Sequence, residues 1–155
     1  MNFEFRDMHP EDADSKGYVH WKTWQETYTG LMDEKYLTNH SLKKCQSIAH
    51  RWPENTLVAE VDGKIVGFSC YGKDDSGTGE IIAIYLLKEY QGYGLGRKLM
   101  NAAIDKLDGC SPIALYVLKG NDNAIGFYEH YGFRFDGTSK EIAVGTELRR
   151  VYHKR

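Results

Sequence analysis

The sequence contains no apolar run close to the roughly 18 residues that a membrane-spanning helix needs. Its first six residues, MNFEFR, lack the apolar core of a signal peptide, so we expect an intracellular, cytoplasmic protein. The formal net charge of -2 provides no general basic surface, and we therefore expect neither a nucleic-acid nor a membrane partner. Any anionic ligand then needs a local binding site.

Cysteine is scarce, and its spacing argues against a redox pair or a zinc site. The three residues Cys45, Cys70 and Cys110 lie far apart, with no Cys-x-x-Cys pair, which favours buried free thiols. The six histidines show neither His-x-x-x-His nor Glu-paired metal-binding spacing. We therefore predict that the protein binds no metal.

The chain length, 155 residues, is typical of one domain. Hydrophobic residues make up 41% of the chain and charged residues 27%, which favours a globular protein with its own core over a disordered tail. The sequence shows no repeat, no low-complexity segment and no linker. We therefore expect a single domain over residues 1–155.

Hydrophobic periodicity predicts alternating strands and helices. The expected strands cover residues 3–6, 56–61, 64–71, 80–87, 113–118, 133–139 and 147–152, and the expected helices cover about 10–30, 33–50, 97–107 and 121–131. Asp62-Gly63 is a strong hairpin signal, and residues 80–87 form the nearly continuous apolar run of a strand covered on both faces. The order indicates an α+β (α/β) fold: a mixed sheet of six or seven strands flanked by about four helices.

A glycine-rich turn, Gln91-Gly92-Tyr93-Gly94-Leu95-Gly96, joins the apolar strand to the next helix. The first amides of a helix lack internal partners and carry positive potential, and glycines let a phosphate approach the backbone. By itself, this turn is equally consistent with a tight connection that binds nothing. A dinucleotide fingerprint is excluded because Arg97 occupies the position of its third glycine, and no Gly-Lys-Ser/Thr ending of a Walker motif follows.

Two segments resemble the GNAT superfamily of N-acetyltransferases. Gln91, Gly94 and Gly96 match the family pattern Gln/Arg-x-x-Gly-x-Gly/Ala, and residues 121–133, NDNAIGFYEHYGF, are similar to its N-x-x-A-I-x-F-Y-x-x-x-G-F stretch. Lys88 departs from the family, where many members have proline. The likeness is to small bacterial members of the polyamine and protein-alanine type. It implies the GNAT fold, in which the fourth and fifth strands splay apart.

The resemblance implies acetyl-CoA as cosubstrate, with its pantetheine arm between the splayed strands and its pyrophosphate on the glycine turn. The cofactor-binding residues that it implies are Ile84, Tyr85, Leu86, Gln91, Gly92, Tyr93, Gly94, Leu95, Gly96, Arg97 and Asn121. The amide of Leu86 is expected to stabilise the oxyanion. Asn121 has an alternative role as the cap of the following helix.

Tyr128 aligns with the family tyrosine that protonates the departing thiolate, a role that suits a phenol protonated at pH 7. An alkylammonium acceptor, with a pKa of about 10, must first lose a proton. Glu80 is the candidate general base, expected to act through a bridging water, although a solvated glutamate at a strand entrance is the alternative. No cysteine or serine has an evident activating partner, so direct attack in a ternary complex is expected.

Trp24 and Tyr28 lie on the helix that borders the acceptor side in this family, although such aromatic residues more often belong to the core. The implied acceptor is a primary amine, in a small molecule such as a polyamine or at a peptide N-terminus. The alternative function is a non-catalytic CoA-binding sensor or regulatory module, against which Tyr128 argues. The fold often forms homodimers, but no sequence feature decides the oligomeric state.

Overall fold

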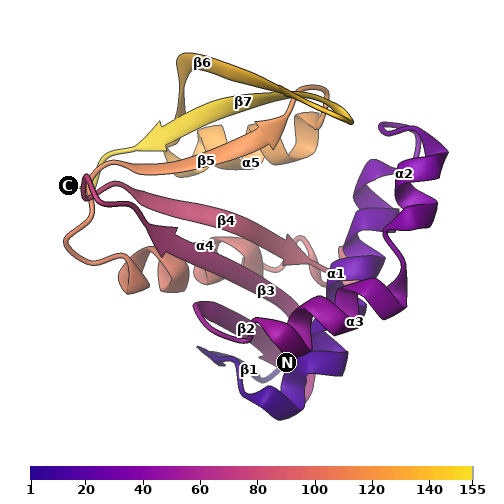
Figure 1. The fold of residues 1–155 in the computed structure, drawn as a ribbon. Coiled ribbons are helices and arrows are strands. Elements are labelled where there is room, and N and C mark those ends of the chain that lie inside the picture. Colours follow the sequence, from indigo (N-terminus) through magenta and orange to yellow (C-terminus); the bar gives the residue numbers. More distant parts are fainter. Residues whose placement is uncertain (155) are drawn as a thin grey trace.

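The computed structural model describes residues 1–154, which form one mixed sheet flanked by helices (Figure 1). The strand order is β1-β2-β3-β4-β5-β7-β6, with β4 and β5 parallel and the other neighbours antiparallel. The strands are β1 (Phe3–Asp7), β2 (Thr56–Val61), β3 (Lys64–Lys73), β4 (Gly79–Leu86), β5 (Ile113–Leu118), β6 (Arg134–Ile142) and β7 (Gly145–Tyr152). The helices are α1 (Ala13–Tyr28), α2 (Glu34–Asn39), α3 (Leu42–Arg51), α4 (Leu95–Lys106) and α5 (Asp122–Tyr131), with short 3-10 turns η1 (Pro10–Asp12) and η2 (Lys88–Tyr90). This architecture confirms the predicted fold class.

The predicted hairpin connects β2 and β3 at Asp62 and Gly63. Both residues have positive φ angles, 50° and 83°. Two consecutive left-handed residues produce the turn whose twist matches that of the paired strands, and glycine adopts this conformation at little cost. The local sequence alone therefore specifies this corner of the sheet.

The two faces of the sheet receive different helices. Along β3, Phe68 points toward α1, where its ring lies 4.4 Å from the Lys16 Nζ atom. Tyr71 points the other way, close enough to Lys106 of α4 for that ammonium to affect its pKa. On α4 the predicted apolar stripe is confirmed, and its four members are at most 2% exposed: Leu95, Leu99, Ala103 and Leu107. The core therefore lies on both sides of β2–β4.

The segment 33–50 is two helices and not the one that was predicted. α2 ends at Asn39 and α3 begins at Leu42. Ser41 has extended backbone, and its Oγ atom accepts a hydrogen bond from the backbone N–H of Lys44 at 3.1 Å. A serine cap of this kind satisfies one of the free amides of a new helix. The corner at His40 and Ser41 therefore turns the chain between α2 and α3.

The strands β4 and β5 diverge soon after they begin. Their parallel pairing is limited to Gly79 with Ile113 and Glu80 with Ala114. From there β4 and the β5–β7–β6 part of the sheet separate toward the end that faces α1 and α2 (Figure 1). The splay that the family resemblance implied is therefore present.

A β-bulge in β4 accompanies this divergence. Ile81 pairs with Tyr71 and Ala83 pairs with Cys70, so that Ile82 is an extra residue without a partner. Ile82 is 61% exposed, and the second half of β4 is only half-buried. The expectation that this strand is covered on both faces is therefore wrong at Ile82 and beyond, because the bulge turns one side chain outward and β5 no longer pairs there.

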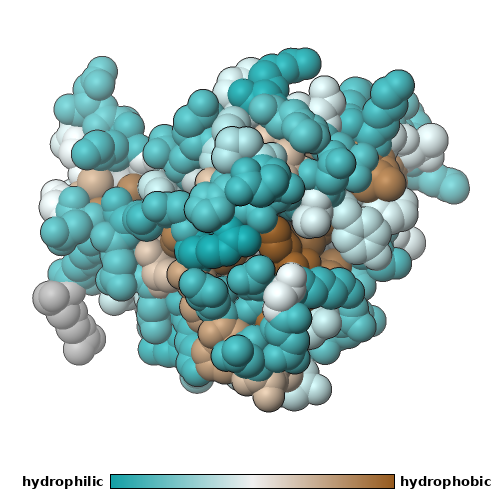
Figure 2. Space-filling view, turned by 90° about the horizontal axis from the view of Figure 1, so that it is seen from below, coloured by the Kyte–Doolittle hydropathy of each residue, from teal (hydrophilic) through white to brown (hydrophobic). Residues whose placement is uncertain are grey.

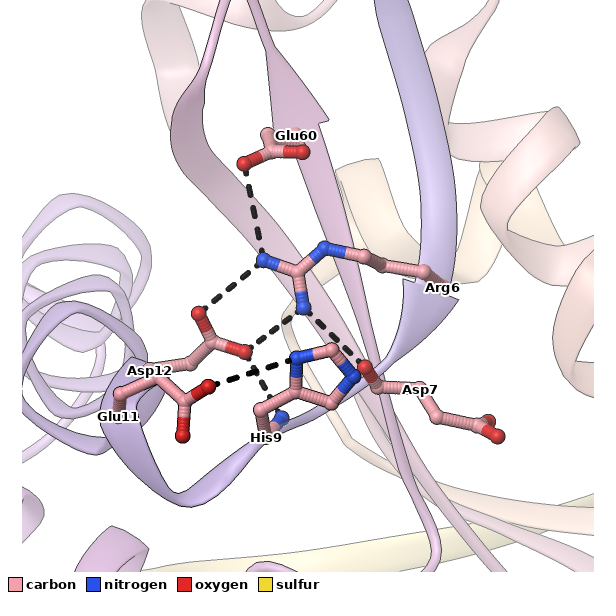
Figure 3. A network of polar contacts seen from close by, with 6 residues as sticks. All are labelled: Arg6, Asp7, His9, Glu11, Asp12 and Glu60. Atoms are coloured by element: carbon pink, nitrogen blue, oxygen red, sulfur yellow. Dashed lines mark hydrogen bonds and ion pairs between the residues drawn. The ribbon is translucent and has the colours of Figure 1, made fainter.

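The entrance to α1 is held by a polar network (Figure 3). The Arg6 guanidinium donates to both carboxylate oxygens of Asp12, at 2.7 and 3.1 Å, and lies 3.6 Å from Glu60. Asp12 also accepts the backbone N–H of His9 at 2.8 Å. The network therefore connects β1, β2 and η1. The surface seen from below is mainly hydrophilic, and apolar residues show chiefly in its middle (Figure 2).

Candidate active site

The glycine-rich turn presents open backbone at the start of α4. Gly92 and Gly94 have φ angles of 88° and 78°, and a Cβ atom built on either residue has no neighbour within 4 Å. Gly94 is the N-cap of α4 and provides no side-chain cap. The first amides of α4 therefore have no side-chain acceptor from their cap, and the positive end of the helix favours an anion there.

Other residues of the turn have structural contacts of their own. The Gln91 Nε2 atom donates to the carbonyl oxygen of Leu86 at 3.0 Å, which ties the turn to the end of β4. A Cβ atom on Gly96 would lie 3.4 Å from the Phe127 ring, so this glycine brings α4 close to α5. The Arg97 guanidinium lies 5.0 Å from the centre of the Tyr131 ring. Leu95 is buried and Tyr93 is 61% exposed.

The backbone of Leu86 is directed into the gap between β4 and β5. The neighbouring Leu87 N–H donates to the Val66 carbonyl of β3 at 2.9 Å. Because successive residues of a strand direct their N–H and C=O groups to opposite sides, those of Leu86 face away from β3. The same alternation places the N–H of Ile84 on the gap side, whereas the backbone of Tyr85 pairs with Phe68 of β3.

Three tyrosines from different elements converge beside the gap: Tyr28 of α1, Tyr85 of β4 and Tyr128 of α5. The hydroxyl oxygens of Tyr28 and Tyr85 lie 3.5 Å apart. Tyr128 lies close enough to both for each pair to interact electrostatically. Burial raises the pKa of all three hydroxyls above the ordinary value of 10. The cluster is therefore neutral at physiological pH, and its phenols are able to donate protons.

Apolar and acidic groups surround this tyrosine cluster. The Trp24 ring lies 5.0 Å from that of Tyr28, and its buried Nε1 atom has no hydrogen-bond partner among residues 1–154. The residues that pack with Tyr28 are Trp24, Leu31, Met32, Leu37, Tyr85, Leu118 and Val144. Glu147 of β7 lies near enough to contribute to the raised pKa of Tyr28. The structure therefore brings Trp24 and Tyr28 together with Tyr128.

Glu80 lies elsewhere. It pairs with Ala114 and Gly72 at the closed end of the gap, five residues before Tyr85. Because Ile82 is the extra residue of the bulge, this separation spans only the four residues from Gly72 to Phe68 on β3, or about 13 Å at about 3.3 Å per residue. Within residues 1–154 the carboxylate of Glu80 makes no hydrogen bond and no ion pair. The structure therefore does not place this candidate base beside the tyrosine cluster.

Asn121 is the N-cap of α5, and its Oδ1 atom accepts the backbone N–H of Ala124 at 3.4 Å. The capping role that the sequence offered as an alternative is therefore present. Its side chain also lies near the hydroxyl of Tyr28. Sequence reasoning missed Glu147, because no motif marks this position of β7 and only the fold places it near Tyr28.

Comparison with known proteins identifies the family to which this chain belongs. The model of the Acetyltransferase (GNAT) family matches residues 17–133. The uncharacterized N-acetyltransferase YuaI of Bacillus subtilis is 30% identical over 137 residues, which cover 81% of this chain and 77% of that protein. The spermidine N(1)-acetyltransferase of Thermoplasma acidophilum is 28% identical over 149 residues, 89% of this chain and 92% of that protein.

Among solved structures, the PaiA N-acetyltransferase of Thermoplasma acidophilum in complex with coenzyme A has the same fold. It superposes with a TM-score of 0.82 at 23% identity and covers 99% of this chain and 100% of that one. Among the described helices of the present chain, none is both long and apolar enough to cross a membrane. The chain belongs to the GNAT family of acetyltransferases, and its enzyme class is that of an acyltransferase.

Proposed function

We propose that the protein transfers an acetyl group from acetyl-CoA to a primary amine by direct attack in a ternary complex. The observation that carries this proposal is the gap between β4 and β5, with an uncapped helix N-terminus at its edge and the tyrosine cluster beside it. Acetyl-CoA lying in the gap would have anion-binding amides at its pyrophosphate and a proton donor beside its thioester. The coenzyme A bound by the PaiA protein supports the choice of cofactor.

The cofactor is held mainly by backbone. The pyrophosphate lies against the amides of Gly92 to Arg97, where the dipole of α4 and the open glycines favour a phosphate. The pantetheine arm pairs with the gap-facing groups of Ile84 and Leu86 in the manner of an added strand. The Leu86 N–H then faces the thioester carbonyl and stabilises the oxyanion. Tyr85 contributes its side chain, since its backbone is already paired with β3.

Tyr128 is the proposed general acid. The amine nitrogen attacks the thioester carbonyl carbon, the carbon–sulfur bond breaks, and the departing thiolate takes the phenolic proton of Tyr128. Solvent then returns a proton to the phenolate. The proton that the amine loses passes to water, and Glu80 acts only through a chain of water molecules because it lies at the closed end of the gap.

The acceptor that we propose is a polyamine. Trp24 and the tyrosines form an aromatic wall, which suits an alkyl chain and a second ammonium group through cation–π attraction. Glu147 supplies a carboxylate near that wall. The relationship to a protein named spermidine N(1)-acetyltransferase supports this class of acceptor.

An amine panel tests the proposal. The purified chain is incubated with acetyl-CoA and spermidine, butylamine or a peptide with a free N-terminus, and thiol release and acetylated product are measured. We expect spermidine to have the lowest KM. Glu147→Gln should raise the KM for spermidine roughly tenfold, which corresponds to a loss of about 1.4 kcal/mol of binding free energy. The KM for butylamine, which has no second ammonium group, should stay the same.

The matched control for that variant is Glu141→Gln, on the same β6–β7 hairpin, where the carboxylate accepts the hydroxyl of Thr146 at 2.8 Å. It should leave the KM for spermidine unchanged. If acetyl-CoA binds but no amine is acetylated, the alternative of a non-catalytic CoA-binding module replaces the proposal. Equal KM values for all three acceptors would refute the polyamine assignment alone.

A further inference from the structure

Two histidines and a cysteine meet beside Trp24. His20 comes from α1, His40 is the C-cap of α2, and Cys45 lies in the first turns of α3. One ligand atom of each residue lies within 4.8 Å of those of the other two. The Cys45 Sγ atom is 3.2 Å from the His40 Nε2 atom. The three side chains thus converge on a single point.

The distances lie near those of a tetrahedral zinc site. Zn–S bonds of about 2.3 Å and Zn–N bonds of about 2.0–2.1 Å place a sulfur and a nitrogen ligand about 3.6 Å apart and two nitrogens about 3.3 Å apart. The sulfur–nitrogen contact of 3.2 Å needs to lengthen by a few tenths of an ångström, and the widest pair must draw together. Small rotations of the side chains provide both changes.

The surroundings leave these groups available and hold them in place. Cys45 is fully buried, and the buried Nδ1 atom of His20 has no hydrogen-bond partner among residues 1–154. Buried polar atoms normally have partners, so this nitrogen requires an explanation. The His40 ring stacks on Trp24, with centroids 3.8 Å apart and planes at 19°, which restricts its rotation.

Zinc binds cysteine as the thiolate and histidine through a neutral ring nitrogen, so metal binding at this cluster releases the thiol proton of Cys45 to solvent.

We propose that His20, His40 and Cys45 bind one Zn²⁺ ion. Two imidazoles and a thiolate are ligands that zinc prefers, and they leave a fourth coordination position for water. The ion would clamp α1, the end of α2 and α3 together. Because Trp24 contacts both His40 and Tyr28, the clamp borders the tyrosine cluster. The sequence shows no metal-binding spacing because the ligands come from three helices.

Cobalt titration of the metal-free chain tests this site. The protein is dialysed against a chelator and titrated with Co²⁺, which reports thiolate coordination by a charge-transfer band in the near ultraviolet. Zn²⁺ stoichiometry is measured by equilibrium dialysis and elemental analysis. We expect one ion per chain, a charge-transfer band that Zn²⁺ displaces, and a higher melting temperature with Zn²⁺.

Variants assign the ligands. Cys45→Ser should abolish the band and His40→Gln should weaken Zn²⁺ binding at least about tenfold, whereas Cys110→Ser, at another buried thiol, should change neither. If Cys45→Ser does not fold, bands that persist in Cys70→Ser and in Cys110→Ser assign the thiolate to Cys45. The absence of a band in the wild-type chain, or a band that survives in folded Cys45→Ser, overturns the proposal and leaves a hydrogen-bonded thiol–imidazole pair only.

Discussion

The hydroxyl oxygens of Tyr28 and Tyr85 lie 3.5 Å apart, and this contact joins the last turn of α1 to the strand that borders the gap. Tyr28 belongs to the wall proposed for the acceptor, whereas Tyr85 lies between the gap-facing residues Ile84 and Leu86. The surfaces that we propose for the acceptor and for the cofactor therefore meet at these two side chains. Tyr128 lies near both, where a proton donor to the departing thiolate is needed.

Replacing Tyr128 by phenylalanine removes the proposed acid and keeps the ring that packs against Phe127 and Phe133. We predict that kcat falls roughly 10²-fold, the usual contribution of a general acid, while the Kd for acetyl-CoA stays the same. Steady-state kinetics and calorimetric titration measure the two quantities.

Tyr131→Phe is the matched control on the same helix, because its hydroxyl donates to Asn101 at 2.6 Å and takes no part in the tyrosine cluster. It should retain wild-type kcat. An unchanged kcat in Tyr128→Phe would remove this residue from the mechanism.

The pH dependence of the reaction follows from the same tyrosine. Burial raises the pKa of Tyr128, so the phenol stays protonated throughout the range in which the amine, with a pKa of about 10, becomes increasingly deprotonated. We predict that kcat/KM rises steadily from pH 7 to pH 9 without a decrease at the alkaline end. A decrease with a midpoint below pH 9 would show that an acid with a lower pKa controls the reaction.

Gly94→Asp should weaken acetyl-CoA binding at least tenfold, because a carboxylate at the N-cap of α4 repels the pyrophosphate and occupies its space. The positive φ angle adds strain of about 1–2 kcal/mol for any residue with a Cβ atom.

Gly109→Asp separates these two effects. Gly109 has a similar φ angle, 81°, and open space for a Cβ atom, but it follows the other end of α4. We expect a comparable loss of stability and unchanged cofactor affinity. Equal affinities in both variants would show that the turn does not bind the cofactor.

Asp12→Asn should lower the free energy of unfolding by about 1–3 kcal/mol, because the buried partner of Arg6 loses its charge. The hydrogen bond from Arg6 lowers the pKa of Asp12 in the folded protein. The stabilisation is therefore complete above the unfolded pKa of about 4 and is lost as the pH falls through the folded value.

Urea unfolding between pH 3 and pH 7 measures the difference in unfolding free energy between the wild-type chain and Asp12→Asn. This difference should become smaller as the pH falls. Asp7→Asn is the control, because the Asp7 pair with Lys106 is exposed and solvent screens it. If Asp7→Asn loses as much unfolding free energy as Asp12→Asn, burial does not make the Asp12 pair more stabilising than the exposed one.

Local signals predicted most of the fold. The repeat of Leu95, Leu99, Ala103 and Leu107 and the Asp62-Gly63 turn are encoded by neighbouring residues, and both predictions are confirmed. The break at Ser41 was missed because no glycine or proline marks it, while a serine cap decides the helix boundary. The bulge at Ile82 was missed because, in the sequence, this unpaired isoleucine looks like its apolar neighbours.

The candidate site was predictable only where it is local. The glycine turn and Tyr128 lie within contiguous motifs, whereas the approach of Tyr28, Tyr85 and Glu147 depends on how three distant segments pack. The roles of all site residues stay predictions until they are measured. So do the cytoplasmic location, the division into one domain and the homodimer.

Direct transfer, as we propose it, passes the acetyl group from acetyl-CoA beside the tyrosine cluster to the amine without an acetylated enzyme. Rapid-quench mass spectrometry of the wild-type chain with acetyl-CoA and spermidine measures whether such an intermediate forms. We expect acetylated spermidine and free coenzyme A in equal amounts, with no acetylated protein at any time. Acetyl groups that appear on the chain before the product, or acetyl-CoA that binds without any transfer, would contradict it.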